Sequence, residues 1–241
     1  MEATAFHTPD AVTVPAVTAT EMRSVDDVAV ETVGLTLPRM MEHAGRALAR
    51  EVLGGRPSDT DNPVVVLAGG GGNGGGGLVC ARHLANRAVP TGVVLDREPT
   101  AISGVPGEQL AILEHTDASV TGEQAPPRPA LVVDALLGYG LRGSPRGRAA
   151  TLIEWTASVT APVVSLDVPS GVDATTGETP GPSVEPDVTL TLALPKTGLV
   201  GRPERLVLAD LSIPEAVYER LDIPAVAPFG DRFRVALTLD T

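Results

Sequence analysis

Oxygen-bearing side chains lie where two apolar runs end and inside a glycine-rich stretch. Asp134 belongs to VVDALLG, Asp167 and Ser170 belong to SLDVPSG, and Asn73 belongs to AGGGGNGGGGLV. Because parallel strands end at one edge of a sheet, we expect these four side chains to converge. Carboxylate, amide and hydroxyl oxygens suit a hard cation or a general acid–base pair. Any one of them alone could instead cap a helix or a turn, so only the joint pattern indicates a site.

Eight glycines surround Asn73 within residues 68–79. The stretch follows an apolar, β-branched run at 63–69 and precedes a segment of helical periodicity at 78–87, which predicts the order strand, glycine loop, helix. In that position glycines let the backbone approach a phosphate, and the helix N-terminus supplies N–H donors. We predict a nucleotide or phosphate cradle, against the alternative of a flexible linker. No lysine follows the glycines, which excludes a P-loop.

Asp96 ends the apolar run at 91–98. It lies about 20 residues beyond the glycines, where a dinucleotide-binding fold places the acid that binds a ribose. An exposed aspartate that caps a turn at a strand end is an equally good interpretation. Asp96 therefore stays an open candidate.

Short apolar runs alternate with segments of helical spacing along the chain. Thr18 and Glu21 have capping-box spacing at the start of one helix (21–34), and Pro38 opens a second (37–55). Such alternation predicts a doubly wound α/β fold, with a mostly parallel sheet covered on both faces. The strands are expected within 63–69, 91–98, 130–138, 161–171, 187–196 and 205–211, and a further helix within 147–159.

The remaining segments set the expected domain boundaries. Residues 1–17 show no periodicity and are predicted to form a loose N-terminal arm. Residues 18–241 are predicted to form a single domain, because a chain of 241 residues commonly folds as one α/β unit. The segments 121–129 and 174–186 are rich in Pro, Thr, Gly and Glu and are predicted loops.

Composition limits the partners and the compartment. The net charge of −12 disfavours nucleic acid and anionic membranes as partners. No apolar run approaches the roughly 20 residues of a membrane span, the N-terminus lacks a secretory signal pattern, and Cys80 is the single cysteine; together these predict a cytoplasmic protein. An acidic chain whose only lysine is Lys196 suggests a halophilic cytoplasm, with a GC-rich genome as the alternative.

In its combination of motifs the chain resembles the YjeF N-terminal domain family, the NAD(P)H-hydrate epimerases. The resemblance covers residues from about 20 to about 215, and its motifs are specific together although each is weak alone. It implies a Rossmann-like three-layer α/β/α sandwich with N-terminal helices. It also implies epimerisation of the R and S forms of the hydrated nicotinamide cofactor NAD(P)HX, with a bound potassium ion. The motifs, in chain order, are MEHAG (41–45), AGGGGNGGGGLVCARHL (68–84), VDALLGYGLRG (133–143), LDVPSGVDATTG (166–177) and DVTLTLALPKTGL (187–199).

The resemblance assigns roles to individual residues. Asp167 corresponds to a substrate-binding acid, and Lys196 with Gly198 matches a proline-lysine-glycine signature. The potassium ligands correspond to Asn73, Asp134 and Ser170. The nucleotide-binding loop falls on Gly72, Asn73, Gly74, Gly75 and Gly76, and a second phosphate-contacting loop on Gly138, Tyr139, Gly140, Leu141, Arg142, Gly143 and Ser144.

The chain departs from the family pattern at Gly76, where the family usually has the aspartate proposed for proton transfer. Asp167 is then the remaining acid–base candidate for an NAD(P)HX epimerase. The alternative is a catalytically silent nucleotide-binding or dimerisation module. An NAD-dependent oxidoreductase is disfavoured, because no tyrosine–lysine or histidine pair for hydride transfer stands out. A homodimer and functional coupling to a separate NAD(P)HX dehydratase are the open partner assignments.

Overall fold

The computed structural model describes residues 5–57, 61–121, 128–224 and 226–239. Its main sheet has eight strands in the order β10-β9-β8-β7-β6-β3-β4-β5. Neighbouring strands are parallel except for β9 and β10. The strands are β3 (Val64–Ala68), β4 (Thr91–Leu95), β5 (Ser119–Thr121), β6 (Leu131–Ala135), β7 (Val163–Leu166), β8 (Val188–Leu192), β9 (Arg205–Ala209) and β10 (Arg234–Leu237). This architecture confirms the predicted α/β class with a mostly parallel sheet.

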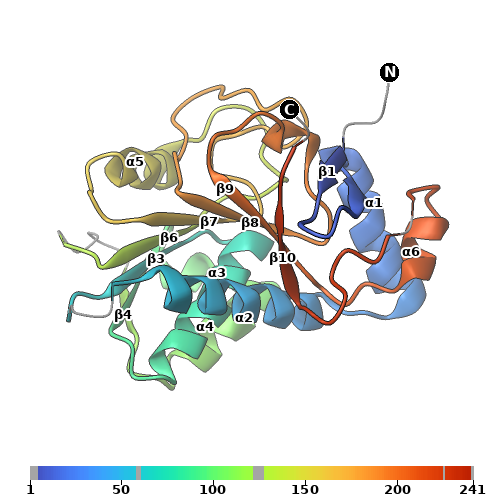
Figure 1. Ribbon diagram of the computed structural model, residues 1–241. Helices are drawn as coiled ribbons and strands as arrows, with labels where there is room; N and C mark the ends of the chain where they lie inside the picture. Colours follow the sequence, from blue (N-terminus) through green and yellow to red (C-terminus); the bar gives the residue numbers. More distant parts are fainter. Residues whose placement is uncertain (1–4, 58–60, 122–127, 225, 240–241) are drawn as a thin grey trace.

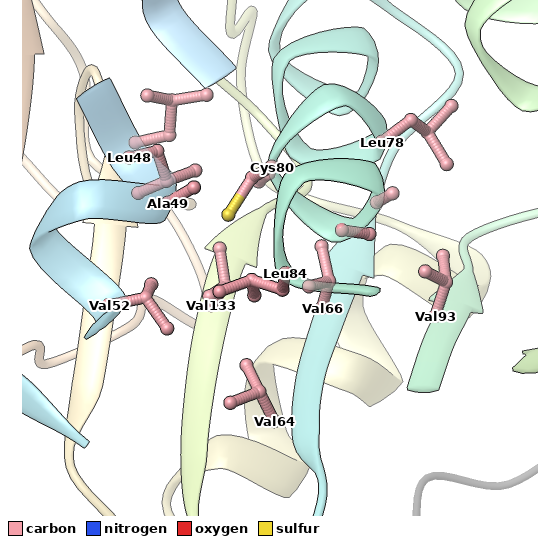
Figure 2. Close-up of a cluster of buried hydrophobic side chains, with 14 of the residues drawn as sticks. Leu48, Ala49, Val52, Val64, Val66, Leu78, Cys80, Leu84, Val93 and Val133 are labelled. Atoms are coloured by element: carbon pink, nitrogen blue, oxygen red, sulfur yellow. The ribbon is translucent and has the colours of Figure 1, made fainter. Parts of the chain in front are cut away.

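Helices cover both faces of the sheet (Figure 1). One face carries α2, α3 and α4, and the other carries α5. Figure 2 shows part of the core under α2 and α3, where Cys80 and Leu84 face the strand side chains Val64 and Val133. The helical elements are α1 (Ala19–Asp27), the π-helical turn η1 (Val28–Val33), α2 (Leu37–Gly55), α3 (Gly72–Ala85), η2 (Pro99–Ala101), α4 (Gly104–Leu113), α5 (Gly147–Thr156), η3 (Thr197–Leu199) and α6 (Glu215–Glu219).

The strand order places a ligand-binding crevice at a defined point. From β8 to β5 the order is that of a dinucleotide-binding sheet, in which the chain first moves outward from β3 to β4 and β5 and then returns to β6 on the other side. Loops that leave β3 and β6 therefore diverge, and ligands of such sheets bind between them, beyond the carboxyl ends of the strands.

The two predicted N-terminal helices are present. Thr18 and Glu21 form the expected capping box, in which the Thr18 hydroxyl accepts a hydrogen bond from the Glu21 N–H (3.2 Å) and the Glu21 carboxylate accepts one from the Thr18 N–H (2.7 Å). Gly34 ends the turn after α1 with a left-handed φ of 79°, a conformation that glycine adopts at low cost. Pro38 lies in the first turn of α2.

The predicted loose arm is wrong for the described residues 5–17. They form a two-stranded antiparallel sheet of β1 (Ala5–His7) and β2 (Thr13–Pro15), in which Phe6 and Val14 are buried. His7 also exchanges backbone hydrogen bonds with Thr238, at 2.8 and 2.9 Å. The partner strand segment lies at the other end of the chain, so no local pattern in the sequence could indicate this pairing.

The predicted glycine loop is shorter than expected. The helix begins at Gly72 rather than after the glycines, which leaves only 69–71 as the loop between β3 and α3. Glycine disfavours helices by about 1 kcal/mol relative to alanine, which is why the periodicity of the sequence did not extend the helix. Packing overrides that propensity: a Cβ at Gly77 would lie 2.6 Å from the Ala135 Cβ, so α3 lies directly on the sheet.

Candidate functional site

A cavity of about 1040 Å³ opens at the carboxyl edge of the sheet. It is bounded by α1 and η1, by the start of α3, and by the loops that follow β4, β6 and β7. This is the crevice that the strand order predicts, and its volume accommodates a dinucleotide-sized ligand. Of the residues that the sequence indicated, those that line it are Gly72, Asn73, Gly76, Asp96, Gly138, Tyr139, Gly140, Leu141, Arg142, Ser144 and Asp167.

The other sequence-indicated residues lie outside the cavity lining. Gly74 and Gly75 are buried in α3, where their missing side chains make room for the Gly69 backbone and for Met41, respectively. Gly143 lies in the loop after β6, with a left-handed φ of 69°. Asp134 and Ser170 are fully buried behind the cavity wall.

Asp134 is the centre of a buried hydrogen-bond cluster. Its carboxylate accepts hydrogen bonds from the Ser170 hydroxyl (2.5 Å), the Ser170 N–H (2.9 Å) and the Ser165 hydroxyl (2.8 Å). The Ser170 hydroxyl also lies 2.9 Å from the backbone nitrogen of Leu137 and 3.2 Å from its carbonyl oxygen. Burial raises the pKa of Asp134, and the hydrogen bonds from Ser170 and Ser165 act against that shift. The cluster ties the ends of β6 and β7 together.

Asp167 forms a buried ion pair with Lys196. The Lys196 Nζ lies 2.5 Å from the Asp167 Oδ1 and 2.9 Å from the Leu192 carbonyl oxygen, and the two side chains are 1% and 5% exposed. Asp167 has a φ of 69°, a left-handed conformation that aspartate tolerates better than most residues. Its Oδ2 accepts a hydrogen bond from the Tyr139 N–H (3.2 Å). The pair therefore places a carboxylate in the cavity lining, with the Lys196 ammonium group buried behind it.

Asn73 approaches the same carboxylate from α3. A Cβ at Gly138 would lie 3.2 Å from both the Asn73 Cγ and the Asp167 Oδ2, so the two side chains flank the Gly138 backbone. The Asn73 Nδ2 is buried without a hydrogen-bond partner among the described residues. A buried polar atom of this kind is available to a ligand of the cavity. The expected convergence thus brings Asn73 and Asp167 together, with the Asp134–Ser170 cluster behind them.

Tyr139 and Asp26 form a second polar pair in the cavity lining. The Tyr139 hydroxyl donates a hydrogen bond to the Asp26 Oδ2 at 2.5 Å, and burial raises the pKa of Asp26. Arg23 and Lys196 lie 5.9 and 5.8 Å from the centre of the Tyr139 ring. Asp26 was not predicted from the sequence. It lies one helical turn after Met22 and directly after Val25, and both of these residues are buried. Apolar residues at this spacing indicate that Asp26 lies near the inward face of α1.

Gly76 lines the cavity beside Leu166. A Cβ at Gly76 would lie 2.8 Å from the Leu166 Cδ2, the end of a flexible side chain, and 3.9 Å from the Ala44 Cβ. Gly76 has no left-handed φ, so its backbone conformation is open to other residues. Among the described residues no group of three or more His, Cys, Asp or Glu side chains could hold a metal ion. None of the described helices is both long enough and apolar enough to cross a membrane.

Comparisons with known proteins bear on the chain as a whole. The family described as YjeF-related protein N-terminus matches residues 38–198. An NAD(P)H-hydrate epimerase of Dehalogenimonas lykanthroporepellens is 44% identical over 97% of both chains. One of Truepera radiovictrix is 37% identical over 87% of this chain and 96% of its own. A bifunctional NAD(P)H-hydrate repair enzyme of Salinibacter ruber is 38% identical over 86% of this chain and 42% of its own length.

A solved structure shares the fold. The crystal structure of yeast ynu0 superposes with a TM-score of 0.78 and covers 89% of this chain and 96% of its own. Its sequence identity is 24%, so the likeness concerns the architecture alone. The sheet and its covering helices are therefore an arrangement that distant sequences also adopt.

Proposed function

The chain belongs to the family of YjeF-related protein N-termini, and from this we infer that it is an NAD(P)H-hydrate epimerase, an isomerase of cofactor repair. The substrate is hydrated NADH or NADPH, whose R and S forms it interconverts. The relatives named as epimerases match this chain over nearly its whole length, which supports the same activity here.

The observation that carries the assignment is the position of the Asp167–Lys196 pair. The pair lies at the carboxyl edge of the sheet, where a dinucleotide-binding fold holds its ligand. The glycine-rich start of α3 borders the same cavity, and its free N–H groups suit a pyrophosphate. A reactive carboxylate and a phosphate-binding edge in one cavity fit a nucleotide whose ring undergoes acid–base chemistry.

The reaction requires that the hydroxyl at C6 of the hydrated ring become labile, through ring opening or loss of water, and that it be restored on the other face. We propose that Asp167 exchanges the proton in these steps, which supplies a rate factor of about 10² to 10⁴. Lys196 orients the Asp167 carboxylate and balances its charge. Tyr139 holds the second carboxylate oxygen through its backbone N–H.

We further propose that the site binds a potassium ion through the oxygens of Asn73, Asp134 and Ser170. The unpartnered amide of Asn73 supports this, because an amide turned by half a rotation presents its oxygen to a cation instead. Potassium is held by oxygen ligands that replace its hydration shell. One carboxylate together with a neutral amide oxygen and a neutral hydroxyl oxygen is therefore a suitable donor set for this hard, monovalent ion. The ion would fix the geometry of the loops that hold Asp167.

The same relatives also support a proposal about the second enzyme activity to which this protein is coupled. The bifunctional repair enzymes of Salinibacter ruber and Hyperthermus butylicus match this chain over 42% and 37% of their own length, which supports coupling to a second repair activity. We propose that this activity is an NAD(P)HX dehydratase. The proposal also includes a cytoplasmic location, which rests on the single cysteine and the lack of a membrane or secretory pattern, and a homodimer, which rests on the family resemblance. It includes a salt-adapted surface as well, which rests on the acidic, lysine-poor composition.

An epimerase assay tests the function. Purified protein in KCl is incubated with R-NADPHX and an S-specific dehydratase, and consumption of the R form is compared with spontaneous epimerisation. We expect consumption above the spontaneous rate, and a loss of about 10² or more in Asp167→Asn. Asp117→Asn, at an exposed position away from the cavity, is the control and should retain the wild-type rate.

Gly76→Asp separates the epimerase from a silent module. Because Asp167 supplies the acid–base group, the added carboxylate should change the rate by less than about tenfold. If wild type shows only the spontaneous rate and Gly76→Asp accelerates it, the wild-type chain is a silent module. If neither protein exceeds the spontaneous rate, the epimerase assignment is wrong.

A further inference from the structure

A charged pair at the end of β4 has no role in the chemistry described above. Asp96 directly follows β4, and Asp96 and Arg97 both line the cavity. In a dinucleotide-binding sheet this position faces the ribose of the adenosine, at the far end of the ligand from the nicotinamide ring. An acid there binds the ribose hydroxyls of NAD, whereas a nearby arginine accommodates the 2′-phosphate of NADP. The state of Asp96 therefore indicates which dinucleotide the site selects.

The Asp96 carboxylate is already hydrogen-bonded to the neighbouring residue, Arg97. Its carboxylate oxygens accept hydrogen bonds from the Arg97 Nε (2.7 Å) and Nη2 (2.9 Å), and its side chain is 6% exposed. Each oxygen of Asp96 already accepts one hydrogen bond from Arg97, so about half of the acceptor sites of the carboxylate are taken before a ribose binds. Its negative charge, which would repel a phosphate, is balanced by the guanidinium.

Arg97 is in contrast available to a ligand. Its side chain is 47% exposed, and only one N–H of Nε and one of Nη2 are directed to Asp96. A guanidinium has five N–H donors, so three remain without an acceptor among the described residues. The hydrogen bonds to Asp96 raise the pKa of Arg97 further, so the group stays charged.

The loop at the start of α3 fixes the position of this guanidinium. A Cβ at Gly70 would lie 2.5 Å from the Arg97 Nε and 2.6 Å from its Cζ. The guanidinium therefore lies against the backbone of the glycine loop, and Gly70 is the residue that leaves room for it. Arg142 and Arg146 line the same cavity. The fourth arginine of the lining, Arg23, and the acids Asp26, Asp27 and Glu31 belong to α1 and η1, so Arg97, Arg142 and Arg146 are the cations that the loops after β4 and β6 offer to an anion.

We propose that Arg97 binds the 2′-phosphate of the adenosine ribose, with Asp96 as the positioning residue, and that the protein therefore selects NADPHX over NADHX. The proposal rests on the proposed function and names the substrate form of the same site. A planar guanidinium held by a carboxylate on one edge presents its other edge to a phosphate with little loss of side-chain freedom. The charge of Asp96, the acid at this position, is balanced by Arg97, so Asp96 would repel a dianionic phosphate there only weakly.

The first test measures binding without catalysis. The probes are 2′,5′-ADP and 5′-AMP, which differ in the 2′-phosphate, and their affinities are measured by calorimetry at one fixed salt concentration. We expect wild type to bind 2′,5′-ADP about tenfold to hundredfold more tightly than 5′-AMP, the range of a hydrogen bond to a charged group. Arg97→Gln should remove that difference and leave 5′-AMP unchanged. Arg87→Gln, an exposed arginine at the end of α3 outside the cavity lining, should behave as wild type.

The second test measures selectivity in the reaction. The ratio of kcat/KM for NADPHX to that for NADHX should fall by about tenfold or more in Arg97→Gln, through a higher KM for NADPHX. Asp96→Asn should lower the ratio less, because it loosens the guanidinium without removing it. Equal affinity of wild type for the two probes, or an equal loss on both substrates in Arg97→Gln, overturns the proposal. Turnover of neither substrate would contradict the epimerase function, while the calorimetric comparison would still decide the role of Arg97.

Discussion

The two walls of the cavity are built in opposite ways. The wall at the start of α3 consists largely of backbone: Gly72 and Gly76 line it, and Gly74, Gly75 and Gly77 are buried behind it, where a Cβ would lie 2.6 Å or less from neighbouring atoms. The opposite wall, at the ends of β6, β7 and β8, is held in place by charged and polar side chains with defined partners. There the side chains of Asp134, Asp167 and Lys196 are each at most 5% exposed and hydrogen-bonded.

This difference determines which kind of substitution destabilises each wall. At Gly74, Gly75 and Gly77 the glycine wall depends on the absence of atoms, so a side chain added there would displace packed neighbours. The polar wall depends on the presence of partners, so removing one leaves a buried charge or donor uncompensated. Substitutions that add volume at these three glycines should therefore damage the first wall, and substitutions that delete a partner should damage the second.

Gly74→Val should have the largest effect. Any Cβ at this position overlaps the carbonyl oxygen of Gly69, which is backbone and has no alternative rotamer. We expect the variant to lose its cooperative thermal unfolding transition, followed by circular dichroism. Gly72→Ala, in the same helix but with open space around its Cβ, is the control and should be as stable as wild type or up to about 1 kcal/mol more stable. A Gly74→Val protein that melts like wild type would contradict the close contact.

Lys196→Met should have the next largest effect, because it removes the cation that balances a buried carboxylate. Breaking a buried ion pair from one side costs about 3 to 5 kcal/mol. Urea unfolding near pH 7 measures the loss. The double variant Lys196→Met with Asp167→Asn removes the stranded charge and should recover most of the stability. If the single and double variants were equally stable, the Asp167 carboxylate would not depend on Lys196.

Sequence patterns predicted the elements of the fold better than its contacts. The β-branched runs identified β3, β4, β6, β7, β8 and β9, because buried parallel strands carry a strong local signal. The short β1 and β2 and the edge strand β10 carry little such signal, and their pairing joins the two ends of the chain. The glycine run indicated the position of the cavity edge. It did not indicate the first turns of α3, because the low helix propensity of glycine argues against a helix that packing nevertheless stabilises there.

The polar site was predictable by residue type and less so by pairing. Asp134, Asp167, Ser170 and Asn73 stood out because strand ends and glycine loops are sites of function in α/β folds. The side chains that complete the site come from distant segments: Asp26 is 113 residues from Tyr139, and Asp167 is 29 from Lys196. Such separations leave no periodic signal, so only the folded arrangement shows which charge is balanced by which partner.

The smallest expected effect concerns the proposed potassium ion. Its ligand Asn73 comes from α3 and its ligand Asp134 from the end of β6, so the ion would join the two walls. An ion bound only by the folded state stabilises it by mass action, by about 2.7 kcal/mol when its concentration is 100 times the dissociation constant. For a chain of this size that corresponds to roughly 5 to 10 °C. Wild type should therefore melt higher in KCl than in tetramethylammonium chloride of equal ionic strength.

Asn73→Ala and Asp134→Asn should each remove that difference, because the first deletes a ligand and the second removes the charge of one. The comparison of salts cancels the general cost of each substitution. Asn86→Ala, an exposed asparagine at the other end of α3, is the matched control and should keep the full difference. If Asp134→Asn abolished the potassium dependence and Asn73→Ala did not, the ion would belong to the polar wall alone. Equal melting of wild type in both salts would contradict the ion itself, and the unpartnered Asn73 amide would then point to the nucleotide as its partner.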